Sequence, residues 1–115
     1  MTDPVTFEII KHRLWQINDE QGIAIKTISA SPIVVEGNDF HVGLFTRDAE
    51  LVTAGIGSLV HVTTMGDALS SIIDGGESIE DGDIFMTNDP FLGALHQNDV
   101  VVASPLFRNG DIFMW

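Results

Sequence analysis

The segment from residue 4 to about residue 29 most constrains the fold, because it predicts one long helix. Asp3 is a good N-cap, and Pro4 occupies the first helical position, where its missing N–H costs nothing. Apolar residues recur at helical spacing and predict one buried stripe. This stripe comprises Phe7, Ile10, Leu14, Ile17, Ala24 and Ile28. Gln21 and Gly22 interrupt it, so we expect a kink or a weak turn there. Such a helix needs a larger interface than 115 residues readily supply.

Short strands are predicted after this helix. Ser31-Pro32 ends the helix, because a residue that precedes proline disfavours the α conformation. Three short runs then carry β signals, namely residues 33–35, 40–45 and 51–54. The polar segment 46–50 joins the last two runs as a predicted hairpin.

A second, shorter helix is predicted to begin near Thr64, where Thr64-x-x-Asp67 resembles a capping box. Its expected buried face comprises Met65, Ala68, Leu69, Ile72 and Ile73. Asp74-Gly75-Gly76 ends this helix. Helices interspersed with mainly antiparallel hairpins predict the α+β class.

The last residues predict a hairpin whose second strand stops abruptly. Asn109-Gly110 is the preferred dipeptide of a type I′ turn, between residues 100–107 and 112–115. The returning strand ends on Phe113-Met114-Trp115, its most apolar point, and natural termini are seldom so apolar unless they dock. We therefore interpret residues 1–115 as a segment of a larger domain, cut short after Trp115. An intact small protein is the alternative.

Composition excludes several functions. Seventeen acidic residues against five basic ones give a net charge of -12, and no Lys/Arg cluster exists to bind nucleic acid or an anionic membrane surface. The chain has no cysteine, so a metal site would need His, Asp or Glu ligands. No secretory signal and no apolar run of about 20 residues is visible, which predicts a cytoplasmic protein without a membrane span.

The twelve-residue loop Asn88–Asp99 is the main candidate for function. It lies between two apolar runs, and connections of this length in a compact domain are usually functional or disordered. Phe91, Leu92 and Leu95 make it too apolar for a disordered linker. It also concentrates Asp89, His96 and Asp99, residue types that bind metals or move protons.

Two interpretations of this loop stay open on spacing alone. His96 and Asp99 lie three residues apart and could converge on Zn, Mn, Fe or Ni, but a catalytic zinc site typically needs three protein ligands. The alternative is a surface histidine beside an Asn-Asp turn. Similarly, Asn88-Asp89-Pro90 either stops a strand or orients a ligand from outside the coordination sphere.

The remaining histidines carry weaker signals. His61 lies between valines before the second helix, which is typical of a half-buried, hydrogen-bonded side chain. Asp39 is expected to form a turn, with a smaller chance of facing the same site as the loop. His41 and His12 are expected on the surface or on a strand face. No phosphate-binding glycine loop and no nucleophile elbow occurs.

Several motifs together resemble the N-terminal part of the hydantoinase B/oxoprolinase family, in family order along essentially the whole chain. The most specific is Asn88-Asp89-Pro90-Phe91-Leu92-Gly93 with His96-x-x-Asp99. The others are residues 3–10, Asn38-Asp39-Phe40 with Leu44-Phe45, Val60-His61 before Met65, Gly82-Asp83-Ile84-Phe85, Pro105-Leu106-Phe107 and Asn109-Gly110.

The resemblance implies one subunit of an ATP-dependent hetero-oligomer, with ATP bound by a hydantoinase A-like partner. It implies a divalent metal (Zn, Mn or Fe) held by His96, Asp99 and a further histidine beyond Trp115, so that residues 1–115 alone hold an incomplete site. Asp89 would be the catalytic candidate, as a general base or an orienting group. Asn88, His61 and Asp39 would support the site. Ala94-Leu95 and Gln97-Asn98 depart from the residues common in the family around the ligand histidine.

Three functions follow as hypotheses. The first is an ATP-coupled amidohydrolase that opens a cyclic amide such as a hydantoin or 5-oxoproline. The second is the metal-binding subunit of an ATP-dependent ketone carboxylase. The third is a non-catalytic assembly segment whose long helix docks on a partner.

Overall fold

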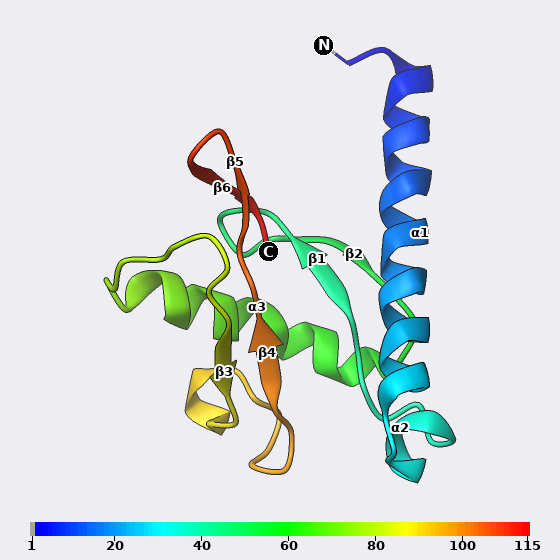
Figure 1. The fold of residues 1–115 in the computed structure, drawn as a ribbon. Coiled ribbons are helices and arrows are strands. Elements are labelled where there is room, and N and C mark those ends of the chain that lie inside the picture. Colours follow the sequence, from blue (N-terminus) through cyan, green and yellow to red (C-terminus); the bar gives the residue numbers. More distant parts are fainter. Residues whose placement is uncertain (1) are drawn as a thin grey trace.

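The computed structural model describes residues 2–115, and it has the predicted α+β architecture. Two helices dominate: α1 (Pro4–Ile28) stands along one side, and α3 (Leu59–Asp74) crosses the molecule among three small hairpins (Figure 1). Each hairpin is a separate two-stranded antiparallel sheet. The strands are β1 (Gly43–Phe45), β2 (Leu51–Ala54), β3 (Phe85–Thr87), β4 (Val101–Ala103), β5 (Leu106–Arg108) and β6 (Asp111–Met114). Two short turns complete the fold, α2 (Pro32–Val35) and the 3₁₀ turn η1 (Pro90–Leu92).

Helix α1 begins as predicted, but it packs through a different face. The Asp3 carboxylate accepts hydrogen bonds from the Val5 and Thr6 amides, with Pro4 as the first helical residue. The helix runs without interruption past Gly22, which is buried against the side chain of Ile56. The least exposed face of the helix comprises Lys11, Leu14, Asn18, Gly22, Ile25 and Lys26. Of the predicted stripe only Leu14 lies on this face, whereas Phe7, Ile10, Ile17, Ala24 and Ile28 are exposed.

Two of the strand predictions need correction. Residues 33–35 form the helical turn α2 instead of a strand, because Pro32 is favoured at a first helical position and Glu36 N–H donates to its carbonyl. Only residues 43–45 of the run 40–45 pair as a strand. The hairpin through residues 46–50 is confirmed, with β1 antiparallel to β2.

The core lies where the hairpins meet α3. Phe45, Leu69 and Trp115 form its buried centre. Trp115 pairs with Phe45 through two backbone hydrogen bonds of 2.9 Å, and its ring meets Phe85 edge to face at 5.9 Å between centroids. The apolar end of the chain is therefore docked in the core, as Figure 1 shows beside β1.

The start of helix α3 and the strands of the last hairpin differ from their predicted bounds. The helix begins at Leu59, one and a half turns before Thr64, whose hydroxyl instead donates to the His61 carbonyl. The predicted strand 100–107 is divided into β4 and β5, because Ser104-Pro105 separates them. The turn at Asn109-Gly110 is confirmed, with φ values of 55° and 89°. Among the described residues, neither long helix is apolar enough to cross a membrane.

Candidate functional site

The loop Asn88–Asp99 connects the paired strands β3 and β4 and is ordered by its own hydrogen bonds. The Asp89 carboxylate accepts from the Phe91 amide at 2.9 Å and so caps η1. The Asp89 carbonyl accepts from the Leu92 and Ala94 amides. Asn88 donates to the Gln97 carbonyl at 3.2 Å, which joins the two ends of the loop.

Gly93 sets the loop directly against α3. It has a φ of +102°, and a Cβ there would lie 2.3 Å from the Ala68 nitrogen and 2.7 Å from the Thr64 carbonyl oxygen. His61 precedes Thr64 by three positions, so His61, Thr64 and Ala68 share one face of the helix. The backbone contact at Gly93 therefore brings the end of the loop beside His61.

Four predicted residues meet at this place, and we call them the histidine–aspartate cluster: Asp39, His61, His96 and Asp99. His96 Nδ1 lies 3.3 Å from Asp99 Oδ2, and His61 Nδ1 lies 3.6 Å from the same oxygen. His61 Nε2 is 3.1 Å from Asp39 Oδ1. The His61 and Asp99 side chains are only 16% and 20% exposed, while that of His96 is 59% exposed. The cluster thus has a half-buried centre, His61 and Asp99, flanked by the exposed side chains of His96 and Asp39.

Asp99 is the group that best fits a cation. Its Oδ2 atom is buried and receives no hydrogen bond within residues 2–115, although two imidazole nitrogens face it. A buried carboxylate oxygen without a donor is costly unless a positive charge compensates it. Imidazole and carboxylate together suit Zn, Mn or Fe. Residues 2–115 do not, however, assemble three His, Asp or Glu side chains in a metal-holding arrangement.

Asp89 and Asn88 lie apart from the cluster. Both side chains are exposed, and within residues 2–115 no hydrogen bond or ion pair joins Asp89 to His96 or Asp99. The Asp89 carboxylate is engaged in capping, which matches the structural interpretation of Asn88-Asp89-Pro90. The role of Asp89 as a general base stays a prediction.

His41 was expected on the surface or on a strand face, but it is half-buried and lies outside the strands. Both of its ring nitrogens are buried and have no hydrogen-bond partner within residues 2–115. Burial lowers the pKa of His41 below its usual value, and the neighbouring His61 lowers it further. Strand alternation over residues 40–45 could not reveal this environment, because only residues 43–45 form a strand.

This environment predicts a pH dependence of folding. Because the pKa of His41 is lower in the folded protein than in the unfolded chain, the unfolded chain binds more protons below about pH 6.5. The contribution of His41 to the free energy of unfolding is therefore fully present above that pH, and it is lost as the pH falls through the pKa of His41 in the folded protein. We expect the urea concentration at the unfolding midpoint to decrease when the pH is lowered from 7 to 5. The decrease should be smaller in His41→Gln. His12→Gln, on exposed α1, should keep the wild-type slope, and an unchanged slope in His41→Gln would contradict the assignment.

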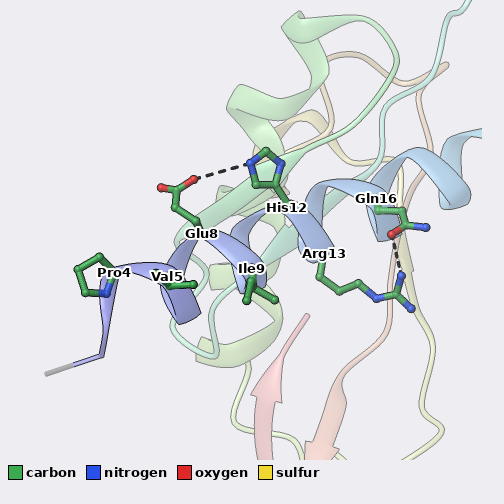
Figure 2. A pocket seen from close by; sticks show the side chains of 7 residues that line it. All are labelled: Pro4, Val5, Glu8, Ile9, His12, Arg13 and Gln16. Carbon is green, nitrogen blue, oxygen red and sulfur yellow. Dashed lines mark hydrogen bonds and ion pairs between the residues drawn. The ribbon is translucent and has the colours of Figure 1, made fainter.

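A surface hollow elsewhere on the molecule lacks these features. It runs along the first half of α1 and is lined by Pro4, Val5, Glu8, Ile9, His12, Arg13 and Gln16 (Figure 2). All of these residues belong to one helix, so nothing closes over the hollow. Its Glu8 and His12 form a loose ion pair at 3.7 Å, with no further carboxylate or imidazole among the lining residues. The candidate site is therefore the cluster beside α3.

Known proteins resemble this chain over almost its whole length. The family model for hydantoinase B/oxoprolinase matches residues 3–115. 5-Oxoprolinase 1 of Arabidopsis thaliana is 30% identical over 113 residues, which are 97% of this chain and 9% of that protein. The acetone carboxylase alpha subunit of Xanthobacter autotrophicus is 31% identical over 94 residues, 78% of this chain and 12% of the subunit.

A solved structure shows the same fold. Nucleotide-free acetone carboxylase superposes with a TM-score of 0.91 and 27% identity, over 98% of this chain and 15% of that one. The chain thus spans less than a fifth of the length of each of these three relatives. A match over residues 3–115 and a common fold agree with the resemblance seen in the sequence. This chain belongs to the hydantoinase B/oxoprolinase family.

Proposed function

We propose that this chain belongs to an ATP-coupled enzyme that opens a cyclic amide such as 5-oxoproline or a hydantoin, with a divalent metal at His96 and Asp99. One observation carries the proposal: the buried Asp99 oxygen has no hydrogen-bond donor within residues 2–115, and two imidazoles face it. Four relatives with comparable identity are named 5-oxoprolinases, which supports a cyclic amide as the substrate.

The residues of this chain would hold and orient the metal. His96 and Asp99 would be the ligands, and the Asn88 side chain joins the two ends of the loop that carries them. A third ligand would come from a histidine beyond Trp115, as the family resemblance implies. When bound, the Zn, Mn or Fe ion supplies a Lewis acid for a carbonyl or lowers the pKa of a water. Asp89, at the exposed start of the loop, would be the candidate general base or orienting group.

A partner would supply ATP. Because the chain lacks a phosphate-binding loop, we propose a hydantoinase A-like ATP-binding subunit in a cytoplasmic hetero-oligomer. Two relatives, from acetone and acetophenone carboxylase, are themselves named subunits. The net charge of -12 makes nucleic acid an unsuitable partner.

A second candidate is an ATP-dependent ketone carboxylase. It is favoured by the TM-score of 0.91 against acetone carboxylase, which is described as carboxylating acetone with ATP. The same metal would then stabilise an enolate-type oxyanion. The residues that line the pocket for the organic substrate decide between the two candidates.

The natural enzyme, purified with any subunit that accompanies it, tests these proposals. We expect about one equivalent of Zn, Mn or Fe per cluster by elemental analysis, and ATP-dependent ring opening of 5-oxoproline or hydantoin. ATP-dependent consumption of bicarbonate with acetone or acetophenone would support the carboxylase instead. If the enzyme shows no turnover and binds no metal, the remaining hypothesis is the non-catalytic assembly segment.

A further inference from the structure

Three separate segments of the chain meet through one imidazole. His61 lies in the first turn of α3, with Nε2 3.1 Å from Asp39 and Nδ1 3.6 Å from Asp99. Asp39 follows α2, and Asp99 closes the loop that leaves β3. Asp39 and Asp99, which are 22 and 38 residues away from His61 in the sequence, therefore both lie beside a ring that is only 16% exposed.

We propose that His61, held by Asp39, is a positioning residue that fixes the Asp99 carboxylate toward His96. The proposal rests on the metal site of the proposed function and specifies how that site is built. The final torsions of aspartate and histidine are broad, so neither side chain sets its own orientation. A neighbouring group must select the orientation in which Asp99 Oδ2 faces His96 Nδ1. His61 is the half-buried neighbour whose Nδ1 lies 3.6 Å from this oxygen, in ion-pair range.

Asp39 is in turn firmly placed. Its amide donates to the Ile33 carbonyl at 3.1 Å, and the preceding Asn38 accepts a 2.7 Å hydrogen bond from Lys26 of α1. Asn38 also adopts a φ of 52°, which a tight turn requires. Nε2–H of His61 can donate to the Asp39 carboxylate, and only a ring that also carries a proton on Nδ1 faces Asp99 Oδ2, 3.6 Å away, favourably.

This order of contacts makes a specific prediction, because Asp39 reaches the metal ligand only through His61. Groups that orient metal ligands typically contribute about 10- to 100-fold to metal affinity. Removing either partner should therefore weaken metal binding, and removing both should be no worse than removing His61. Independent structural effects at two sites would instead add.

The test is a double-mutant cycle on the natural enzyme in its own assembly, titrated with Mn²⁺ and with Co²⁺. We expect His61→Phe, which keeps a ring but no nitrogen, to weaken Mn²⁺ binding about 10- to 100-fold. Asp39→Ala should weaken it in the wild-type background and change nothing further in His61→Phe. His61→Gln, which retains a donor and an acceptor, should recover part of the affinity. The intensity of the Co²⁺ absorption bands should indicate the same number of ligands in all variants that bind, because the ligands are unchanged.

The controls separate the possible failures. His12→Phe on α1 should bind Mn²⁺ as the wild type does, and thermal unfolding without metal shows whether each variant is folded. If His96→Ala abolishes binding but His61→Phe does not weaken it, the positioning role is wrong and the metal site stands. A Co²⁺ spectrum that shows one nitrogen ligand fewer in His61→Phe would make His61 a ligand and also overturn the positioning role. If the wild type binds no Mn²⁺ or Co²⁺, or His96→Ala binds as well, the proposed function fails and this inference fails with it.

Discussion

Replacing His96 with alanine is expected to abolish stoichiometric metal binding and to lower turnover of the assembled enzyme more than about 100-fold. That loss exceeds what an orienting group typically contributes, because His96 would be a ligand itself. Its side chain is 59% exposed and contacts Asp99 at 3.3 Å, so its removal leaves the core around Phe45 and Leu69 intact. Elemental analysis after dialysis and turnover with saturating ATP measure the two effects.

Asp99→Asn removes the second proposed metal ligand and provides an independent test. The change keeps the size of the side chain but removes the negative charge that would neutralise a divalent cation. We expect the same loss of metal as in His96→Ala. His12→Ala is the matched control, since its imidazole is 67% exposed on α1, where it contacts Glu8 and Trp15 of the same helix. Retention of metal and turnover in both His96→Ala and Asp99→Asn would rule out this loop as the metal site.

The start of α1 was predictable because its signals are local, whereas its buried face was not. Asp3 and Pro4 act within one turn, and the structure uses both. Apolar residues surround the first half of the helix, so the sequence stripe cannot say which side meets the domain. The contact falls on Asn18 and Gly22, where small or polar residues let the segment around Gly55 approach closely.

The same distinction applies to the site. His96 and Asp99 lie three residues apart in one loop, so their spacing predicts their contact. The meeting of Asp39, His61 and Asp99 depends on where α3 begins and on how the loop docks. The capping box at Thr64 favoured a later start, which would have placed His61 outside the helix. Tertiary packing at Gly93 could not be inferred from local patterns.

Replacing Gly93 with alanine is expected to destabilise the protein by about 2–5 kcal/mol. Two costs combine: the left-handed φ of +102° is unfavourable for any residue with a Cβ, and that Cβ would meet the α3 backbone 2.3 Å from the Ala68 nitrogen. Backbone atoms cannot rotate away as a side chain does, so the loop must lift from the helix. Urea unfolding, followed by circular dichroism, measures the loss.

Gly110→Ala is the matched control for this experiment. Its φ of +89° carries a similar conformational cost, but nothing lies within 4 Å of a Cβ there. We therefore expect a loss of only about 1–2 kcal/mol, and unchanged metal affinity. Gly93→Ala should also weaken metal binding, because a lifted loop carries Asp99 away from His61. Equal destabilisation in the two variants would mean that backbone strain alone acts at Gly93. Unchanged metal affinity in Gly93→Ala would mean that the loop holds its ligands without support from α3.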